Sequence, residues 1–408
     1  MSFNLDTFIR EHVTFRDQSL LEDDLTKYGE ALTRRINDKS VLVIGGAGTI
    51  GSSYIKAMLK FKIRKLVVVD INENGLTELV RDLRSSTDYN VPEEFITYPV
   101  NFGDRVFEKI FHQHGPFEIV ANFAAHKHVR SEKDSFSIEA MIENNVLRAR
   151  KLLDILLVSP PEHFFCVSTD KAANPVNIMG ASKKLMEELI MAYADKLPIT
   201  TARFANVAFS NGSLPLGFLE RLQKKQPWSC PLGIRRFFVS PQESGELCLF
   251  ASVMGESGDI FFPRLDEQRD MIPFDQIALD LLKELGFTPD ICQSEQEAKE
   301  KALMLSAQAS SPSLSYPIYF FGSDTSGEKS FEEFFTDKEI LDTDSFINLG
   351  VVKNSKKRSI TEIDAIFDRL NNLFETEHVT KAAIVEALKD YLPNFEHIET
   401  GKGLDGKM

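Results

Sequence analysis

The sequence has little of what secreted, membrane-spanning or disulfide-stabilised proteins need. It contains four cysteines in 408 residues, and these show neither C-x-x-C spacing nor a compact framework, which indicates reduced thiols. No stretch approaches the roughly 18 consecutive apolar residues of a membrane-spanning helix. The first residues include acids and no uninterrupted apolar core, which argues against a secretory signal. We therefore expect a cytoplasmic protein that contacts no membrane.

Positive charge is also scarce. The 47 Lys and Arg residues face 61 Asp and Glu residues, which gives a formal net charge of −14. A surface of this sign disfavours binding to nucleic acid, because such binding needs a basic footprint. It does not exclude an anionic small molecule, since a local pair such as Arg235-Arg236 can bind one. The histidines and cysteines show no metal-ligand spacing, so we expect no metal site.

What the sequence does contain is a regular alternation of apolar runs with helical patterns. Strands are expected at residues 40–44, 65–70, 94–100, 119–124, 164–168 and 200–205, and helices at residues 49–62, 74–85, 107–114, 138–158 and 179–196. Strands that alternate with helices indicate βαβ units with right-handed crossovers. The predicted fold is α/β, a Rossmann-type doubly wound parallel sheet followed by a smaller α/β substrate lobe.

The pattern changes on both sides of this region. We expect a helical extension at residues 1–38, the Rossmann domain at residues 39–205 and the substrate lobe at residues 206–408. Within the substrate lobe we expect a helical insertion at 288–316 and a final helix at 380–391. The helices at 138–158 and 179–196 carry apolar residues on more than one face. One face must cover the sheet and the other is available for a partner, so a homo-dimer or higher homo-oligomer is expected.

A glycine-rich turn joins the first strand to the first helix. It places glycines at Gly45, Gly48 and Gly51, with Thr49 and Ile50 at the start of the helix. Glycine allows a tight turn there and lets a pyrophosphate approach the helix N-terminus, where free N–H groups favour anions. The alternative is a glycine turn in a cofactor-free α/β protein. The strand before and the helix after the turn favour a dinucleotide site.

An acid at the end of the second strand selects the dinucleotide. Asp70 lies 19 residues after Gly51, where it can accept both adenosine ribose hydroxyls and would repel a 2′-phosphate. NAD is therefore expected in preference to NADP. Asn101 and Phe102 fit the loop that flanks adenine, although a plain turn explains them almost as well.

Several motifs follow one another in a specific order. They are Ala124-Ala125-His126-Lys127-His128-Val129, Asn145-Val146, Ser168-Thr169-Asp170-Lys171 with Ala-Ala-Asn-Pro after it, Met179-Gly180-Ala181-Ser182-Lys183, Arg203-Phe204-Ala205-Asn206-Val207, Ser210-Asn211-Gly212-Ser213, and Arg235-Arg236-Phe237. With the glycine turn, they make the chain similar to an extended short-chain dehydrogenase/reductase. Within that group it resembles the polysaccharide-biosynthesis branch that contains UDP-N-acetylglucosamine 4,6-dehydratases. The resemblance is strong over residues 40–275 and looser beyond.

The resemblance implies oxidation of the sugar at C4 by bound NAD, loss of water across C5 and C6, and return of the hydride to C6. Thr169 would hydrogen-bond the C4 oxygen, and Lys183 would bind the nicotinamide ribose. Lys171 would remove the C5 proton as a neutral amine, which requires a lowered pKa that burial near Lys183 would supply. Asp170 would protonate the departing C6 hydroxyl. Ala124 and Ala125 would lie beside the cofactor.

Met179 departs from the usual pattern, in which a Tyr four residues before the Lys deprotonates the C4 hydroxyl. A thioether cannot take that proton. Some branches of the dehydratases resemble this chain in having Met here. We therefore expect that Asp170 or a water takes the proton, with Lys183 or Thr169 assisting. The alternative is that Met179 fills the core of an inactive relative.

The resemblance also suggests residues for the UDP-sugar. These are Lys127, His128, Asn206, Ser213, Arg235 and Arg236, with Glu243 as a partner behind them. Only one of the two adjacent arginines is expected to point inward, and we prefer Arg236, because an Arg fork suits a diphosphate. His128 is as easily structural. Residues 323–329 suggest a loop over the nucleotide, and Asn211 stands where related proteins often carry Arg.

Three functions compete. The first is an NAD-dependent 4,6-dehydratase of UDP-N-acetylglucosamine or a close UDP-hexosamine. The second is a UDP-N-acetylhexosamine 4-epimerase or dehydrogenase, which needs no C5 base and so leaves the Asp170-Lys171 pair unexplained. The third is a non-catalytic nucleotide-sugar-binding protein, which only Met179 favours. The alternative to a catalytic role for Asp170 and Lys171 is an ordinary surface ion pair.

Overall fold

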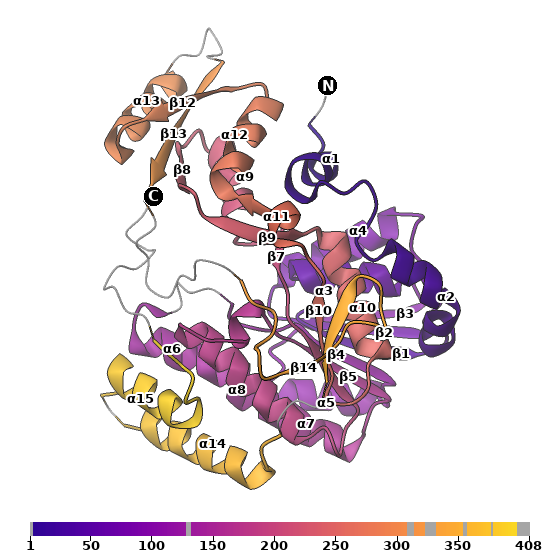
Figure 1. Ribbon diagram of the computed structural model, residues 1–408. Coiled ribbons are helices and arrows are strands. Elements are labelled where there is room, and N and C mark those ends of the chain that lie inside the picture. Colours follow the sequence, from indigo (N-terminus) through magenta and orange to yellow (C-terminus); the bar gives the residue numbers. More distant parts are fainter. Residues whose placement is uncertain are drawn as a thin grey trace.

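The computed structural model describes residues 3–127, 132–307, 314–322, 332–353, 357–376 and 378–397 (Figure 1). Over these residues, the largest sheet has nine strands in the order β14-β15-β10-β6-β5-β4-β1-β2-β3. The strands are β1 (Ser40–Ile44), β2 (Lys65–Asp70), β3 (Glu94–Pro99), β4 (Ile119–Asn122), β5 (His163–Val167), β6 (Ile199–Ala202), β10 (Ile260–Pro263), β14 (Ile340–Asp342) and β15 (Leu349–Lys353). The first six and β10 run parallel, and β15 and β14 close one edge antiparallel. The predicted parallel α/β fold is confirmed.

The central strands are short apolar runs because both faces of the sheet are covered. Within β1, Leu42 and Ile44 pack into the core on one face, and Val41 and Val43 pack into the core on the other. The helices α5 (Arg105–His114), α7 (Arg148–Val158) and α8 (Ile178–Ala192) cover the first face, and α3 (Thr49–Met58) and α10 (Pro241–Met254) cover the second. The sequence alternation therefore reflects a three-layer α/β/α arrangement.

One long helix expected from the sequence is interrupted. The predicted helix at 138–158 consists of α6 (Ser135–Ile142), a π-helical turn η3 (Glu143–Leu147) and α7. A π turn inserts one residue into the i→i+4 pattern and redirects the side chains on it. Hydrophobic periodicity alone does not reveal this π turn, because apolar residues recur at helical spacing on both sides of it and suggest one continuous helix.

The second lobe contains two three-stranded sheets among the described residues. One has the order β11-β9-β7, formed by β7 (Asn206–Val207), β9 (Arg235–Val239) and β11 (Met271–Pro273). The other has the order β12-β13-β8, formed by β8 (Trp228–Pro231), β12 (Thr288–Cys292) and β13 (Ser315–Phe321). The first sheet lies nearer to the large sheet in Figure 1, and the second lies further out.

The predicted helical insertion at 288–316 is wrong in its first part. Residues 288–292 form β12, which runs parallel to β13, and α13 (Glu295–Ala307) begins only after that strand. The segment is thus a β-α-β crossover. The helical pattern of α13 dominates the segment, and it led us to extend the helix over the five residues of β12. That strand forms because it pairs with β13, which lies beyond residue 313.

The chain returns to the large sheet after residue 205. β10, β14 and β15 all belong to it, and α14 (Ile360–Phe374) and α15 (Lys381–Tyr391) cover its helices. A single boundary at residue 205 therefore does not separate the two lobes. Hydrophobic periodicity predicts where strands and helices occur, but it does not predict which sheet a strand near the C-terminus joins.

The helices α14 and α15 occupy a face that the sequence analysis left for a second copy of the chain. α14 packs against α8 and α15 packs against α14, as the yellow helices of Figure 1 show. Arg150 of α7 donates from Nη1 to Asp364 Oδ1 at 2.7 Å, and its guanidinium lies 5.8 Å from the centre of the Phe367 ring. Dimerisation through this face of α7 and α8 is therefore blocked by the chain itself.

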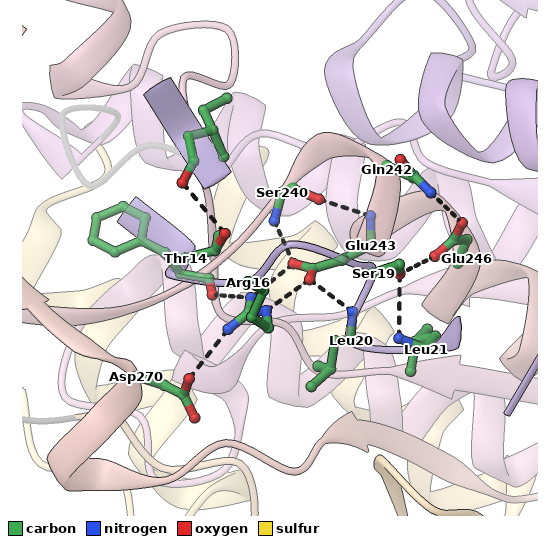
Figure 2. Close-up of polar contacts among 12 residues, drawn as sticks. Thr14, Arg16, Ser19, Leu20, Leu21, Ser240, Gln242, Glu243, Glu246 and Asp270 are labelled. Atoms are coloured by element: carbon green, nitrogen blue, oxygen red, sulfur yellow. Dashed lines mark hydrogen bonds and ion pairs between the residues drawn. The ribbon is translucent and has the colours of Figure 1, made fainter. Parts of the chain in front are cut away.

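The N-terminal residues connect both lobes. α1 (Leu5–Phe8) and the π-helical η1 (Ile9–Thr14) bury Phe8 and Val13 in the core of the second lobe, whereas α2 (Glu22–Ile36) packs against α10. Between them, Arg16 donates to Glu243 Oε1 at 2.7 Å and to Asp270 Oδ1 at 3.1 Å (Figure 2). Both carboxylates are almost completely buried.

No helix within the described residues is both long enough and apolar enough to cross a membrane.

Candidate active site

The glycine turn has the geometry that its sequence predicts. Gly45 has a φ of +77°, and a Cβ there would lie 2.6 Å from the backbone nitrogen of Ala124. A Cβ on Gly51 would lie 2.2 Å from the carbonyl oxygen of Gly45. Any side chain at either position would clash with backbone, so glycine is required. Gly48 is the N-cap of α3, and the N–H groups that follow face the turn.

The carboxylate of Asp70 is fixed beside this turn. Its Oδ2 accepts a hydrogen bond from Ala47 N at 2.9 Å, and its Oδ1 accepts one from Asn72 N at 2.9 Å. Each carboxylate oxygen has a second lone pair, so it can still accept from a ribose hydroxyl. Asn101 and Phe102 follow the carboxyl end of β3: Asn101 Oδ1 accepts from Gly103 N in its own turn, and Phe102 is buried in the core. Their place beside adenine stays a prediction.

A cavity of about 460 Å³ opens at the carboxyl ends of the strands, next to the turn. That is the position and size expected for a cofactor site in a doubly wound sheet. Its lining comprises Gly45, Gly48, Thr49, Ile50, Gly51, Phe123, Ala125, His126, Lys127, Val167, Asn211 and Gly212. It thus includes most of the predicted cofactor residues, while Ala124 contributes the backbone that faces Gly45.

Two further residues line the cavity. Asn211, which stands where related proteins often carry Arg, donates its backbone N–H to Thr49 Oγ1 at 2.9 Å and so lies against the glycine turn. Lys127, assigned to the sugar, lines the same cavity and is exposed to solvent there. Both therefore face the predicted dinucleotide site.

The acid-amine pair lies just beyond β5. Asp170 begins a 3₁₀ turn (Asp170–Ala172), and its backbone N–H donates to Phe204 O at 3.4 Å. Lys171 Nζ donates to both oxygens of Asp170 at 3.2 Å, and Thr169 Oγ1 donates to Asp170 Oδ1 at 2.8 Å. Asp170 is 5% exposed, so this is a buried carboxylate held by a hydroxyl and an ammonium, not a surface pair.

The lowered pKa expected for Lys171 is not found. Burial lowers it, but the negative charges of Asp170 and Glu332 outweigh burial and raise the pKa of Lys171 above 10.5. The residue is therefore an ammonium in the resting site. The expectation was wrong because Lys183, the cation assumed to lie nearby, points elsewhere.

Lys183 is a second, different amine. Its side chain is buried, and Nζ donates to Val167 O at 3.1 Å and approaches Met186 Sδ at 3.9 Å. Burial lowers the pKa of Lys183, and the charges of Cys166 and Glu187 oppose this only in part. An ammonium has three donors, and Val167 O is its one oxygen partner within the described residues. Spare donors are therefore available to hydroxyl groups of a ligand.

Met179 lies four residues before Lys183 on the same helix. Its side chain is 2% exposed and belongs to the apolar core, and its backbone N–H donates to Glu132 Oε1 at 2.8 Å. The thioether thus fills space beside the site, and no proton transfer can be assigned to it.

Asn145 is a positioning residue; it belongs to one of the sequence motifs, but the motif predicted no role for it. It lies on the π turn η3, and its side chain accepts from His126 N at 2.8 Å and donates to His126 O at 2.9 Å. It also donates to Ser182 Oγ at 3.1 Å. Asn145 thereby joins the segment after β4, which lines the cavity, to α8.

A buried ion network supports the end of β5. Arg203 donates to both oxygens of Glu187, at 2.8 and 2.9 Å, and to both oxygens of Glu339, at 2.8 and 2.9 Å. Ser168, directly before Thr169, donates to Glu187 Oε1 at 2.7 Å. Burial raises the pKa of Glu187, but the charge of Arg203 prevails and lowers it to about 2. Arg203 also donates to Phe334 O at 2.9 Å, which anchors a distant segment here.

That segment brings in Glu332, which no sequence signal indicated. Glu332 is 7% exposed; its Oε2 accepts from Phe237 N at 2.8 Å, and its Oε1 accepts from Asn206 Nδ2 and lies 3.9 Å from Arg236 Nε. The structure thus brings Asn206 and Arg236 together, around a carboxyl group. Burial, and next the charge of Asp170, raise the pKa of Glu332 to about 7.

The other residues predicted for the substrate are not gathered at this place. Arg235 is exposed and donates to Met271 O at 2.9 Å, as expected if Arg236 is the inward arginine. Ser213 caps α9 (Leu214–Gln223) through Leu216 N. Glu243 caps α10 and pairs with Arg16, so its predicted place behind the diphosphate is replaced by a structural role (Figure 2). His128 and residues 323–329 lie outside the described residues.

The sheet, the glycine turn and the helix with Met179 and Lys183 define an extended short-chain dehydrogenase/reductase fold. Pen from Bacillus thuringiensis superposes with a TM-score of 0.62 at 19% identity, over 82% of this chain and 99% of that one. The UDP-N-acetylglucosamine 4-epimerase of Methanobrevibacter ruminantium M1, in complex with UDP-N-acetylmuramic acid, gives 0.54 at 14% identity, over 74% and 90%. At these identities the likeness establishes the fold alone.

The profile of the family described as "Polysaccharide biosynthesis protein" matches residues 41–354, and the chain belongs to this family. The capsular polysaccharide biosynthesis protein CapD of Staphylococcus aureus is 26% identical over 90% of this chain and 56% of its own length. The probable polysaccharide biosynthesis protein EpsC of Bacillus subtilis is 27% identical over 64% and 43%. A UDP-glucose 4-epimerase of Rickettsia bellii is 32% identical over 55% and 65%. The chain thus spans about half the length of CapD and EpsC.

Proposed function

We propose that the chain is an NAD-dependent enzyme that modifies a UDP-sugar, and that its reaction is 4,6-dehydration of UDP-N-acetylglucosamine or a close UDP-hexosamine. The observation that carries the proposal is the buried Asp170 carboxylate at the end of β5, which accepts hydrogen bonds from Thr169 and from the partly exposed Lys171. Elimination of water needs one group that takes a proton and one that gives a proton. Epimerisation at C4 needs no such pair at C5 and C6.

The residues present fit NAD. Gly45, Gly48 and Gly51 leave room for a pyrophosphate at the start of α3, and Asp70 can accept from the adenosine ribose. The spare donors of Lys183 suit the hydroxyls of the nicotinamide ribose. When bound, NAD supplies the hydride acceptor for C4 and the hydride donor for C6.

The protein groups can move the protons in a closed sequence. Thr169 bridges the sugar to Asp170, so the C4 hydroxyl proton passes through Thr169 to the Asp170 carboxylate, a route that does not need a tyrosine at 179. Lys171, as a neutral amine, takes the C5 proton while the C6–O bond breaks, and Asp170 gives its proton to the oxygen that leaves as water. Lys171 returns its proton to C5 once C6 has been reduced. The sequence requires that Lys171 first lose the proton it carries at rest.

The second candidate is a UDP-sugar 4-epimerase, which the similarity to the UDP-glucose 4-epimerase of Rickettsia bellii favours. One experiment separates the candidates: incubation with UDP-N-acetylglucosamine in deuterated water, followed by NMR of the sugar. Deuterium at C5 with loss of the C6 hydroxyl is the result expected. Inversion at C4 without exchange at C5 would indicate an epimerase, accumulation of NADH a dehydrogenase, and an unchanged sugar a binding protein. The homo-oligomeric state and the cytoplasmic location stay predictions.

A further inference from the structure

A turn from the second lobe, residues 208–213 (the clamp turn), forms part of the wall of the cofactor cavity. Its residues Asn211 and Gly212 line the cavity together with Gly48 and Thr49. The backbone N–H of Asn211 donates to Thr49 Oγ1 at 2.9 Å, so the clamp turn lies directly against the first residue of α3. The pyrophosphate of NAD is expected at this helix start.

The backbone of the clamp turn contains a conformation that its sequence does not favour. Phe209 has a φ of +53°, and Gly212 has a φ of +73°. Glycine adopts such angles freely, whereas a phenylalanine is held there only by its surroundings. The hydrogen bonds from Ser210 N to Val207 O and from Ser213 N to Ser210 O fix the ends of the turn, not Phe209 itself. Packing of the Phe209 side chain, which is 6% exposed, must therefore stabilise this conformation.

That packing comes in part from the N-terminal helix α1. The rings of Phe8 and Phe209 meet edge to face, with their centres 5.9 Å apart and their planes at 86°. This is a favoured arrangement of two aromatic rings. Phe8 is 1% exposed and belongs to the same buried core as Ala208 and Phe209. The residue with the unfavourable φ is therefore supported by a side chain of α1.

Phe8 is itself fixed to the second lobe. Its ring stacks on the ring of His12, with the centres 4.9 Å apart and the planes at 19°. His12 Nδ1 lies 3.9 Å from Asp280 Oδ2 on α12 (Phe274–Glu284), and η1 packs against β9. Direct contacts thus lead from α12 through two rings of the N-terminal residues to Phe209, and from the clamp turn to Thr49.

We propose that Phe8 is a positioning residue of the cofactor site: it holds the clamp turn against the start of α3, and the clamp turn in that place slows the release of NAD. Phe8 is not part of the described cavity lining, so it acts through Phe209. The inference goes beyond the proposed function, because release of the cofactor is measured without any sugar. In the proposed reaction the hydride returns from the cofactor to the sugar, so NAD need not leave between turnovers.

The first measurement is the rate of cofactor release. The full chain is loaded with NADH and mixed with an excess of NAD, and the decay of the fluorescence of bound NADH gives the dissociation rate. Phe8→Ala should raise this rate about fivefold, because the hydrogen bond from Asn211 N to Thr49 Oγ1 is no longer held in place. Phe8→Leu keeps most of the apolar volume and should raise the rate about threefold. A wild-type rate in Phe8→Ala would overturn the proposal.

Val13→Ala is the matched control for stability. Val13 of η1 is also 1% exposed in the same core, and it carries no ring that could meet Phe209. Its truncation weakens the attachment of the N-terminal residues as well, so urea unfolding should show a loss of stability in both alanine variants. The release rate of Val13→Ala should stay within about 1.5-fold of the wild type. An increase equal to that of Phe8→Ala would indicate a purely structural role for Phe8 and would overturn the proposal.

The second measurement asks whether Phe8 acts through the contact with Thr49. Thr49→Val removes the oxygen that accepts from Asn211 N, so it should itself raise the release rate. In that background Phe8→Ala should add less than about 1.5-fold, because two changes that act on one contact are not additive. A full fivefold effect of Phe8→Ala in Thr49→Val, multiplied on that of the single variant, would refute the route through the clamp turn.

The two measurements stay decisive if Phe8→Ala does not fold. Phe8→Leu then replaces it in both, and a wild-type release rate in Phe8→Leu would overturn the proposal. A chain that releases NADH as expected but converts no UDP-sugar would refute the proposed function and leave this inference standing.

Discussion

Two lysines of the site have opposite surroundings. Lys171 faces two carboxyl groups, which raise its pKa, whereas Lys183 faces a carbonyl and a thioether, and burial lowers its pKa. An amine of the second kind destabilises the folded chain while it is charged and unliganded. Its burial is tolerated because a ligand with hydroxyl groups can satisfy it.

We therefore expect Lys183→Met to stabilise the chain and to abolish NAD binding. The free energy of unfolding should rise by about 1–2 kcal/mol at neutral pH, because a poorly paired buried charge is removed. The folded-state pKa of Lys183 is lowered, so the unfolded chain binds that proton more tightly and wild-type stability rises with pH in that range. The advantage of the variant should be full below the folded-state pKa and shrink as pH rises to 10.5.

Urea unfolding at several pH values and calorimetric titration with NAD measure the two effects. Lys184→Met, on the same helix, is the control for NAD binding. An unchanged NAD affinity in Lys183→Met would contradict the assignment of Lys183 to the ribose.

Glu187 shows the reverse linkage. Its pKa is lowered from 4.5 to about 2 by Arg203, so its contribution to stability is complete above pH 4.5 and is lost as pH falls toward 2. That contribution is about 3 kcal/mol. Glu187→Gln should lose most of it at pH 7 and be less sensitive to acid than the wild type. Urea unfolding at pH 7 and pH 3 tests this, with the exposed Glu162→Gln as control; equal acid sensitivity in Glu187→Gln and the wild type would contradict it.

At the residue level, the sequence predicted the parts of the site that are contiguous. The glycine turn and Asp70 obey local rules, because a strand, a turn and a helix follow one another there. Glu332 could not be predicted, because it is far from the motifs in the sequence and is brought to the site by its contacts with Asn206 and Phe237 and by the following segment, which Arg203 anchors. The sequence predicted a lowered pKa for Lys171, whereas the pKa is raised, because the sequence did not reveal that the negative charge of Glu332 acts on this residue together with that of Asp170.

At the level of elements, α14 and α15 cover the face of α7 and α8 that was predicted to bind a second copy of the chain. The side chain of Ile366 on α14 is completely buried, and Ile363 and Leu370 accompany it. The family match ends at residue 354, before these helices begin. The sequence indicated two apolar faces on α7 and α8 correctly, but it could not show which surface would cover the second.

Ile366→Asp should therefore uncover that second face. We expect the free energy of unfolding to fall by about 3–5 kcal/mol, because a carboxylate cannot be paired in this core. The remaining folded chains should self-associate through α7 and α8, which light scattering after size exclusion would detect. Ala365→Asp lies on the exposed side of the same helix and is the control. If the Ile366→Asp variant is destabilised but associates no more than the control, the uncovered face of α7 and α8 does not mediate self-association.

At the level of the whole molecule, the N-terminal residues hold the two lobes in one arrangement. Arg16 reaches Glu243 at the start of α10 and Asp270 beside β11, and it also donates to Phe238 O at 3.1 Å (Figure 2). Both acids are buried; Arg16 is the cation that pairs with Glu243 among the described residues, whereas Asp270 also pairs with Arg269 Nη2 at 3.3 Å. The arrangement of β9, which carries Arg236, depends on Arg16 in turn.

Arg16→Met should be costly for this reason. We expect about 3–5 kcal/mol of destabilisation, because the buried carboxylate of Glu243 loses its cationic partner and that of Asp270 keeps only the exposed Arg269 among the described residues. The more exposed Arg10→Met should change stability by less than about 0.5 kcal/mol. Urea unfolding measures both, and a UDP-binding titration should show a larger loss in Arg16→Met than in Arg10→Met. Equal stability of the two variants would remove Arg16 from this role.

The order of strands in the large sheet also bears on how the chain is made. β6 pairs with β10, and β10 pairs with β15, which ends at residue 353. During synthesis, β6 therefore leaves the ribosome before β10, which closes its edge, and β10 leaves before β15, so a strand edge stays open to other chains through both intervals. Fragments that stop near residue 205 are expected to need a chaperone, and the protein becomes safe from edge-to-edge aggregation only when nearly all of it has been translated.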